Sequence, residues 1–192
     1  MARVGVLALQ GDVREHVSML ESIGVDVVRV RTSEQLEGLA GLVMPGGEST
    51  TIAHLLATSG VRFDLQARIR AGMPILGTCA GLILLSRHIL DGRAGQWSFG
   101  ALDVDVRRNG YGRQIASFET EIEVKGVGPM PGVFIRAPKI EAWSEDVEVL
   151  ATHDHGDGDH PVLVRQHHVW GCSFHPELTS DDRIHRLFVD AL

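Results

Sequence analysis

The stretch MPILGTCAGLILL, residues 73–85, places a cysteine on a sharp corner between two apolar segments. Residues 73–76 are typical of a short buried strand, and residues 80–90 are typical of a helix. Cys79 stands between them, with Gly77 and Gly81 two positions away on either side. This Gly-x-Cys-x-Gly pattern has the form of a nucleophile elbow in which cysteine replaces the usual serine.

Each part of the elbow pattern has a physical reason. A sharp strand-to-helix turn strains the backbone of the nucleophile, so bulky side chains two residues away would collide. The free N–H groups at the start of the helix would point at the sulfur and favour the thiolate. The amide of Ala80 could also hold the oxyanion of a tetrahedral intermediate. A buried core cysteine remains the alternative here, because cysteine is among the most buried residue types.

Strands alternate with helices in the first half of the chain. Apolar runs predict strands at 3–9, 25–30, 42–44 and 73–76. Amphipathic spacing predicts a helix at 13–23, and Ser49 or Thr50 could cap a helix that runs to residue 56 and continues over 65–69. The alternation predicts a parallel sheet that is covered by helices on both faces.

The second half changes character. Short alternating runs predict further strands at 101–106, 120–124, 133–135, 147–150, 162–164 and 168–174. A last helix is expected over 181–192, capped by Thr179 or Ser180. The fold class is therefore α/β, with a mixed sheet and antiparallel additions. Ligands bind beyond the carboxyl ends of strands in such sheets, which is where Cys79 lies.

SFHPEL, residues 173–178, offers a base for the cysteine. His175 and Glu177 are two residues apart, so on an extended segment they project to the same side, and Pro176 stiffens the arrangement. The carboxylate could hold one imidazole nitrogen and leave the other for Cys79. The tripeptide means little alone, because ten histidines give many chance neighbours of acidic residues. Together with the elbow it predicts a nucleophile–base–orienter triad.

PGGEST, residues 45–50, lies between a predicted strand and a predicted helix. Gly46 and Gly47 would let the backbone approach a ligand and turn an N–H group inward. An ordinary glycine turn followed by a helix cap is the alternative. A phosphate-binding loop is disfavoured, because the lysine of that motif is missing.

Composition restricts the partners and the compartment. The length of 192 residues predicts one domain over residues 1–192, and a content of 44% hydrophobic and 22% charged residues is typical of a soluble globular protein. The net charge of −7 argues against a nucleic-acid surface, and no apolar run is long enough to span a membrane. With only two cysteines and no pattern of a secretory signal, a reduced, cytoplasmic protein is expected. HDHGDGDH, residues 153–160, is interpreted as a solvated loop rather than a metal site, and no metal or cofactor is expected.

These motifs together resemble the class I, or triad, glutamine amidotransferases. More closely, the sequence is similar to the family of glutaminase subunits of pyridoxal 5′-phosphate synthase. The resemblance runs nearly end to end, and its blocks are LALQGDVREH (7–16), MPGGESTT (44–51), GTCAGLILL (77–85), RNGYGRQ (108–114), FIRAP (134–138) and GCSFHPELT (171–179). It implies a three-layer, flavodoxin-like fold with a mostly parallel sheet.

The resemblance also implies the chemistry, which is hydrolysis of L-glutamine to glutamate and ammonia. Cys79 would attack the side-chain amide, His175 would move protons and Glu177 would orient His175. The amides of Gly47 and Ala80 would form the oxyanion hole. The glutamine pocket would comprise Gly47, Glu48, Ser49, Arg108, Ile135 and Arg136.

The family resemblance implies a partner as well. Ammonia would pass to a barrel-type synthase subunit in a hetero-oligomeric complex. Gln10 would contribute to activation when that subunit docks, and weak glutaminase activity is expected without it. Asp12 departs from the alanine that is frequent in the family, which could alter the contact surface.

Three other functions are less consistent with the sequence. Cysteine peptidases of similar fold carry histidine directly after the nucleophile, whereas this chain has Ala80. A non-catalytic scaffold is disfavoured because Cys79, His175 and Glu177 are all present. A different amidotransferase subunit, such as that of the histidine pathway, is disfavoured by the blocks RNGYGRQ and FIRAP.

Overall fold

The computed structural model describes residues 2–110, 117–154 and 156–192, and its centre is a seven-stranded sheet. The strand order is β10-β11-β12-β4-β3-β1-β2. Five of these strands run parallel: β2 (Asp26–Val30), β1 (Arg3–Leu7), β3 (Gly41–Met44), β4 (Ile75–Thr78) and β12 (Val169–Cys172). At one edge β11 (Asp159–Gln166) and β10 (Glu148–Asp154) extend the sheet in antiparallel fashion.

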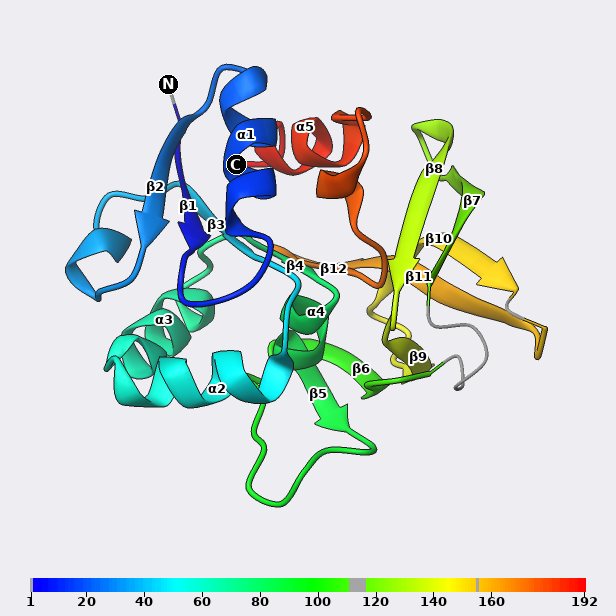
Figure 1. Ribbon diagram of the computed structural model, residues 1–192, viewed down its shortest axis with the longest axis horizontal. Coiled ribbons are helices and arrows are strands. Elements are labelled where there is room, and N and C mark those ends of the chain that lie inside the picture. Colours follow the sequence, from blue (N-terminus) through cyan, green and yellow to red (C-terminus); the bar gives the residue numbers. More distant parts are fainter. Residues whose placement is uncertain (1, 111–116, 155) are drawn as a thin grey trace.

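Helices cover both faces of this sheet (Figure 1). One face carries α1 (Val13–Ser22) and α5 (Arg183–Val189), and the other carries α2 (Ser49–Thr58), α3 (Val61–Arg70) and α4 (Ala80–Leu85). Side chains of β3 alternate between the two faces of the sheet. Val43 packs in the core under α1 and α5, whereas Leu42 and Met44 pack in the core under α2, α3 and α4. The prediction of a three-layer α/β fold with a mostly parallel sheet is confirmed.

Smaller sheets flank the central one. Strands β5 (Ser86–Ile89), β6 (Leu102–Arg107) and β9 (Lys139–Trp143) form one, and β7 (Ser117–Val124) and β8 (Gly128–Ile135) form a hairpin. Two 3₁₀ turns, η1 (Glu34–Leu36) and η2 (Pro176–Leu178), complete the described elements. The described helices include none with the length and apolar character needed to cross a lipid bilayer.

Several predicted boundaries were wrong. The helix after Cys79 ends at Leu85 rather than residue 90, because Ser86 turns extended, hydrogen-bonds to the Ile83 carbonyl (2.8 Å) and starts β5. Gly60, at φ 81°, separates α2 from α3. Strand β9 was not predicted.

The predicted helix caps were also wrong. Glu48, and not Ser49 or Thr50, caps α2, because its carboxylate accepts the Thr50 N–H. Helix α5 begins at Arg183, after Asp182, so neither Thr179 nor Ser180 caps it.

The segment 153–160 is the end of the β10–β11 hairpin rather than a free loop. His153 pairs with His160 and Asp154 with Asp159, and the described tip residues are exposed. Asp154 accepts the N–H groups of Gly156 and Gly158, while Asp157 pairs with Lys139. Among the described residues of this hairpin, the histidines and aspartates form no cluster able to hold a metal ion.

Candidate active site

Cys79 occupies the corner between β4 and α4 in a strained conformation, with φ 48° and ψ −102°. The two flanking glycines explain how the corner fits. A Cβ on Gly77 would lie 2.6 Å from the backbone of Gly81, and a Cβ on Gly81 would lie 2.1 Å from the Met44 carbonyl oxygen. The backbone therefore excludes side chains at both positions. As the first residue of α4, Ala80 has an N–H group with no partner inside the helix.

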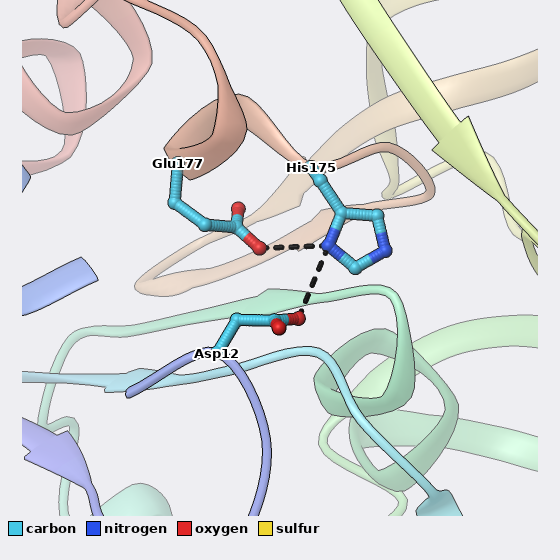
Figure 2. A group of neighbouring side chains, drawn as sticks. All are labelled: Asp12, His175 and Glu177. Carbon is cyan, nitrogen blue, oxygen red and sulfur yellow. Dashed lines mark hydrogen bonds and ion pairs between the residues drawn. The ribbon is translucent and has the colours of Figure 1, made fainter. Parts of the chain in front are cut away.

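His175 precedes the 3₁₀ turn η2, and its side chain is 5% exposed. Its Nδ1 lies 2.7 Å from Glu177 Oε1 and 3.4 Å from Asp12 Oδ2 (Figure 2). Its Nε2 is buried and has no hydrogen-bond partner among the described residues. Because Nδ1 is held by carboxylates, Nε2 is the nitrogen that remains for Cys79.

The charges around His175 favour the imidazolium. Burial alone would lower its pKa, but the neighbouring Asp12, Cys79 and Glu177 side chains favour the charged ring and raise the pKa of His175 to about 12. Cys79 and His175 are thus brought close enough to interact, although they are far apart in the sequence. Such an arrangement can support a thiolate beside an imidazolium.

Asp12, His175 and Glu177 also place potential metal ligands within 4.8 Å of one another. The geometry is that of an ion pair rather than a metal site. Nδ1 and Oε1 lie 2.7 Å apart, the distance of a hydrogen bond, whereas two ligands of a tetrahedral ion at about 2 Å would be roughly 3.3 Å apart. The three side chains therefore hold each other.

The loop between β3 and α2 approaches the elbow with its backbone. Gly47 has φ 146°, and a Cβ there would lie 2.6 Å from Gln10 Oε1 and 3.0 Å from Gly11 Cα. The same Gln10 oxygen accepts the Glu48 N–H at 2.8 Å. Gln10, which follows β1, therefore holds the loop that carries the predicted oxyanion amide of Gly47.

One small pocket opens beside Cys79. Its lining contains all six residues predicted to bind glutamine, together with Cys79, Ile83 and Asn109. The six are Gly47, Glu48, Ser49, Arg108, Ile135 and Arg136. The block 108–114 is described only as far as Gly110, and its remainder lies outside the described residues.

Opposite charges meet on the wall of this pocket. Arg108 lies 3.0 Å from Glu48 Oε1 and donates to Gln96 Oε1 at 3.2 Å, while its buried Nε has no partner among the described groups. Burial would raise the pKa of Glu48, but hydrogen bonds from Thr50 and the charge of Arg108 lower it. The pocket thus offers both a cation and a carboxylate.

Sequence reasoning missed several contributors to this site. Gln96 carries no local pattern that could have identified it, and Asn109 lies in the block 108–114 but was assigned no role. Asp12 was noted only as a departure and not as a neighbour of His175. His16 did leave a signal, since it lies among the apolar positions Val13, Val17 and Leu20 on one helical face.

Comparison with known proteins gives consistent matches. The profile of the SNO glutamine amidotransferase family matches residues 6–192. The chain is 53% identical to pyridoxal 5′-phosphate synthase subunit PdxT of Streptomyces avermitilis over 189 residues, 97% of this chain and 92% of that protein. Identity to the same subunit of a Parafrankia species is 54% over 190 residues, 98% and 92% of the two chains. A crystal structure of a glutamine amidotransferase, 49% identical, superposes with a TM-score of 0.91 and covers 98% of this chain and 97% of its own.

Proposed function

Because the chain belongs to the SNO glutamine amidotransferase family, we propose that it is the glutaminase subunit of a pyridoxal 5′-phosphate synthase. It hydrolyses L-glutamine to L-glutamate and ammonia and passes the ammonia to a synthase subunit that makes the vitamin B6 cofactor. One observation carries the proposal. The imidazole of His175, held by Glu177, interacts with the strained Cys79, which lines a pocket together with Arg108, Arg136 and Glu48.

The chemistry follows from the order of the side chains. The Cys79 sulfur attacks the carbon of the glutamine side-chain amide, and the oxyanion is held by the N–H groups of Gly47 and Ala80. His175 gives its proton to the nitrogen, the carbon–nitrogen bond breaks, and ammonia leaves a γ-glutamyl thioester. His175 then takes a proton from water, whose oxygen attacks the thioester and releases glutamate and the Cys79 sulfur. Glu177 holds the imidazole through both steps.

The pocket wall suits free glutamine. The α-carboxylate of the substrate would pair with Arg108, whose unpaired Nε gives it a further donor, and the α-ammonium would pair with Glu48. Ser49, Ile135 and Arg136 complete the walls around the side chain. A glutaminyl residue inside a peptide lacks both charges, so the pocket would favour the free amino acid.

The proposed partner is a barrel-type synthase subunit, and we expect the complex to form in the cytoplasm. Nucleic acid and membranes have no part in the proposed function. Gln10 connects the partner to the chemistry, because it holds the Glu48 amide next to Gly47. Docking that moves Gln10 would reorient the loop and complete the oxyanion hole. The chain alone would then hydrolyse glutamine only weakly.

The test measures glutamate release from glutamine by the chain alone and after mixing with the purified synthase subunit. We expect the synthase to raise the rate and Cys79→Ala to abolish it. Cys172→Ala is the matched control, because this second cysteine is fully buried and its thiol contacts the Phe174 carbonyl. Equal rates for wild type and Cys79→Ala would refute the mechanism, whereas full activity without the synthase would refute only the activation.

A further inference from the structure

Three buried polar side chains lie directly behind the triad. His16 of α1, Thr78 of β4 and His185 of α5 are all 0% exposed. His16 Nδ1 lies 2.9 Å from His185 Nε2, and His16 Nε2 lies 3.1 Å from Thr78 Oγ1. The same Nε2 lies 3.4 Å from Glu177 Oε2. His16 therefore contacts both the carboxylate of the triad and the residue that precedes Cys79.

The second oxygen of Glu177 needs such a neighbour. Oε1 accepts the bond from His175, whereas Oε2 is buried and accepts no well-formed hydrogen bond from the described residues, with His16 Nε2 lying 3.4 Å away. A carboxylate only accepts, so a buried oxygen of this kind requires a donor. His16 Nε2 is the nitrogen placed to supply it.

The tautomers of the two histidines follow from the same contacts. Burial lowers the pKa of His16 and of His185, the latter to about 4, so both rings are neutral and each has one donor and one acceptor. With the proton of His16 on Nε2, its Nδ1 accepts from His185 Nε2, and His185 Nδ1 carries a lone pair. That Nδ1 is buried without a partner among the described groups.

The opposite arrangement is less favourable. A proton on His16 Nδ1 would leave the Nε2 lone pair facing Glu177 Oε2. It would also require a buried N–H at His185 Nδ1 with nothing to accept it, which costs more than an unmade bond in water. The contacts therefore favour the arrangement in which His185 Nε2 donates to His16 Nδ1 and His16 Nε2 donates to Glu177 Oε2.

We propose that His16, oriented by His185, is a positioning residue that holds the second oxygen of Glu177 and so fixes His175 toward Cys79. This role rests on the proposed glutaminase function. Thr78 shares the same nitrogen, so the contact also ties the carboxylate to the strand that ends at the nucleophile. The alternative is that His16 only fills space in the core under α1.

Two isosteric variants separate these roles. The amide nitrogen of His16→Gln can reach the place of imidazole Nε2 and donate to Glu177. The amide of His16→Asn reaches only the place of Nδ1, so it can contact His185 but not Glu177. Both variants bury a neutral amide of similar polarity, which makes each the folding control for the other, and urea unfolding would check this.

The assay is glutaminase turnover of each variant in complex with the synthase subunit. For His16→Asn we expect kcat to fall by about 10- to 100-fold, the range for losing one hydrogen bond to a charged group, with KM for glutamine unchanged. For His16→Gln we expect kcat within about 3-fold of wild type, because the donor is restored. Equal losses in both folded variants, or no loss in either, would overturn the proposal.

A second readout does not depend on turnover. The rate of alkylation of Cys79 by iodoacetamide, measured against pH and located by mass spectrometry, should shift to higher pH in His16→Asn and stay at the wild-type position in His16→Gln. If the wild-type complex hydrolyses no glutamine, the proposed function fails while this profile still decides the role of His16. Identical profiles for the two variants would refute the positioning role.

Discussion

His175 has two carboxylates on a single nitrogen, and they are unequal. Glu177 is buried and lies 2.7 Å from Nδ1, whereas the Asp12 side chain is 34% exposed and lies at 3.4 Å. Nδ1 carries one proton, so it donates one hydrogen bond, and the nearer oxygen, Glu177 Oε1, accepts it. Asp12 therefore acts on the imidazole mainly through its charge, which water partly screens.

The first prediction concerns this outer carboxylate. Asp12→Asn should lower the pKa of His175 by less than about one unit, because partly exposed pairs contribute about 1 kcal/mol or less. Glu177→Gln should lower it by more, because a buried charge at hydrogen-bond distance is lost. NMR titration of the His175 ring in both variants makes the measurement, and a larger shift in Asp12→Asn would reverse the assigned order.

Individual residues of the site could be predicted from the sequence where the site requires a special backbone conformation or places two oppositely charged side chains close together in the sequence. The elbow at Cys79, the spacing of His175 and Glu177, and the glycines at 46 and 47 could all be read as local patterns. The contacts of Arg108 with Gln96 and of His16 with Glu177 join elements that are not adjacent in the sequence, so no local spacing predicts them. The catalytic and binding roles themselves stay predictions until the variants are assayed.

Among the elements, the turn from β4 into α4 is the most restricted. Gly81 packs against the end of β3, where the Met44 carbonyl leaves no room for a methyl group. This contact sets the distance between the elbow and the loop that follows β3. The position of Cys79 relative to Gly47 thus depends on backbone packing and not on a side-chain bond.

We expect Gly81→Ala to lower the free energy of unfolding by about 3 kcal/mol, because the new methyl would lie 2.1 Å from a backbone atom that cannot move freely. Urea unfolding measures this. Gly92→Ala is the matched control, since its nearest neighbours would lie at 3.4 Å or more. A Gly81→Ala variant as stable as the control would show that the elbow can relax.

Element boundaries were predicted less well than element types, and the reasons are physical. The predicted helix extended over residues 80–90, but pairing with β6 draws residues 86–89 into a strand. Strand β9 was missed because only Lys139 and Ile140 of its residues are buried, so its alternation is weak. In both places tertiary pairing overrides the local pattern.

The whole molecule builds the site from both ends of the chain. The N-terminal segment supplies Gln10, Asp12 and His16, the middle supplies Cys79, and the C-terminal segment supplies His175, Glu177 and His185. Parallel strands bring these segments to one edge of the sheet, whereas α1 and α5 pack together on one face (Figure 1). The site therefore requires that β1, β3, β4 and β12 have come together.

Two of these buried histidines make the free energy of unfolding depend on pH. His16 and His185 have lowered pKa values in the folded protein, about 4 for His185, because burial disfavours their charged forms. In the unfolded chain histidine titrates near pH 6.5, so below that pH the unfolded state binds protons that the folded state does not. The free energy of unfolding should then fall with falling pH. His175 adds no slope in this range, because its raised pKa keeps it protonated in the folded state and the unfolded state is also protonated below pH 6.5.

Between pH 6.5 and 4, each neutral buried histidine should contribute a slope of up to about 1.4 kcal/mol per pH unit. His185→Gln should therefore reduce the pH slope of the unfolding free energy by about that amount, as measured by urea unfolding at several pH values. An unchanged slope in His185→Gln would mean that the buried histidine is already protonated in the folded protein, in which case both of its nitrogens would be donors and Nε2 would still donate to His16.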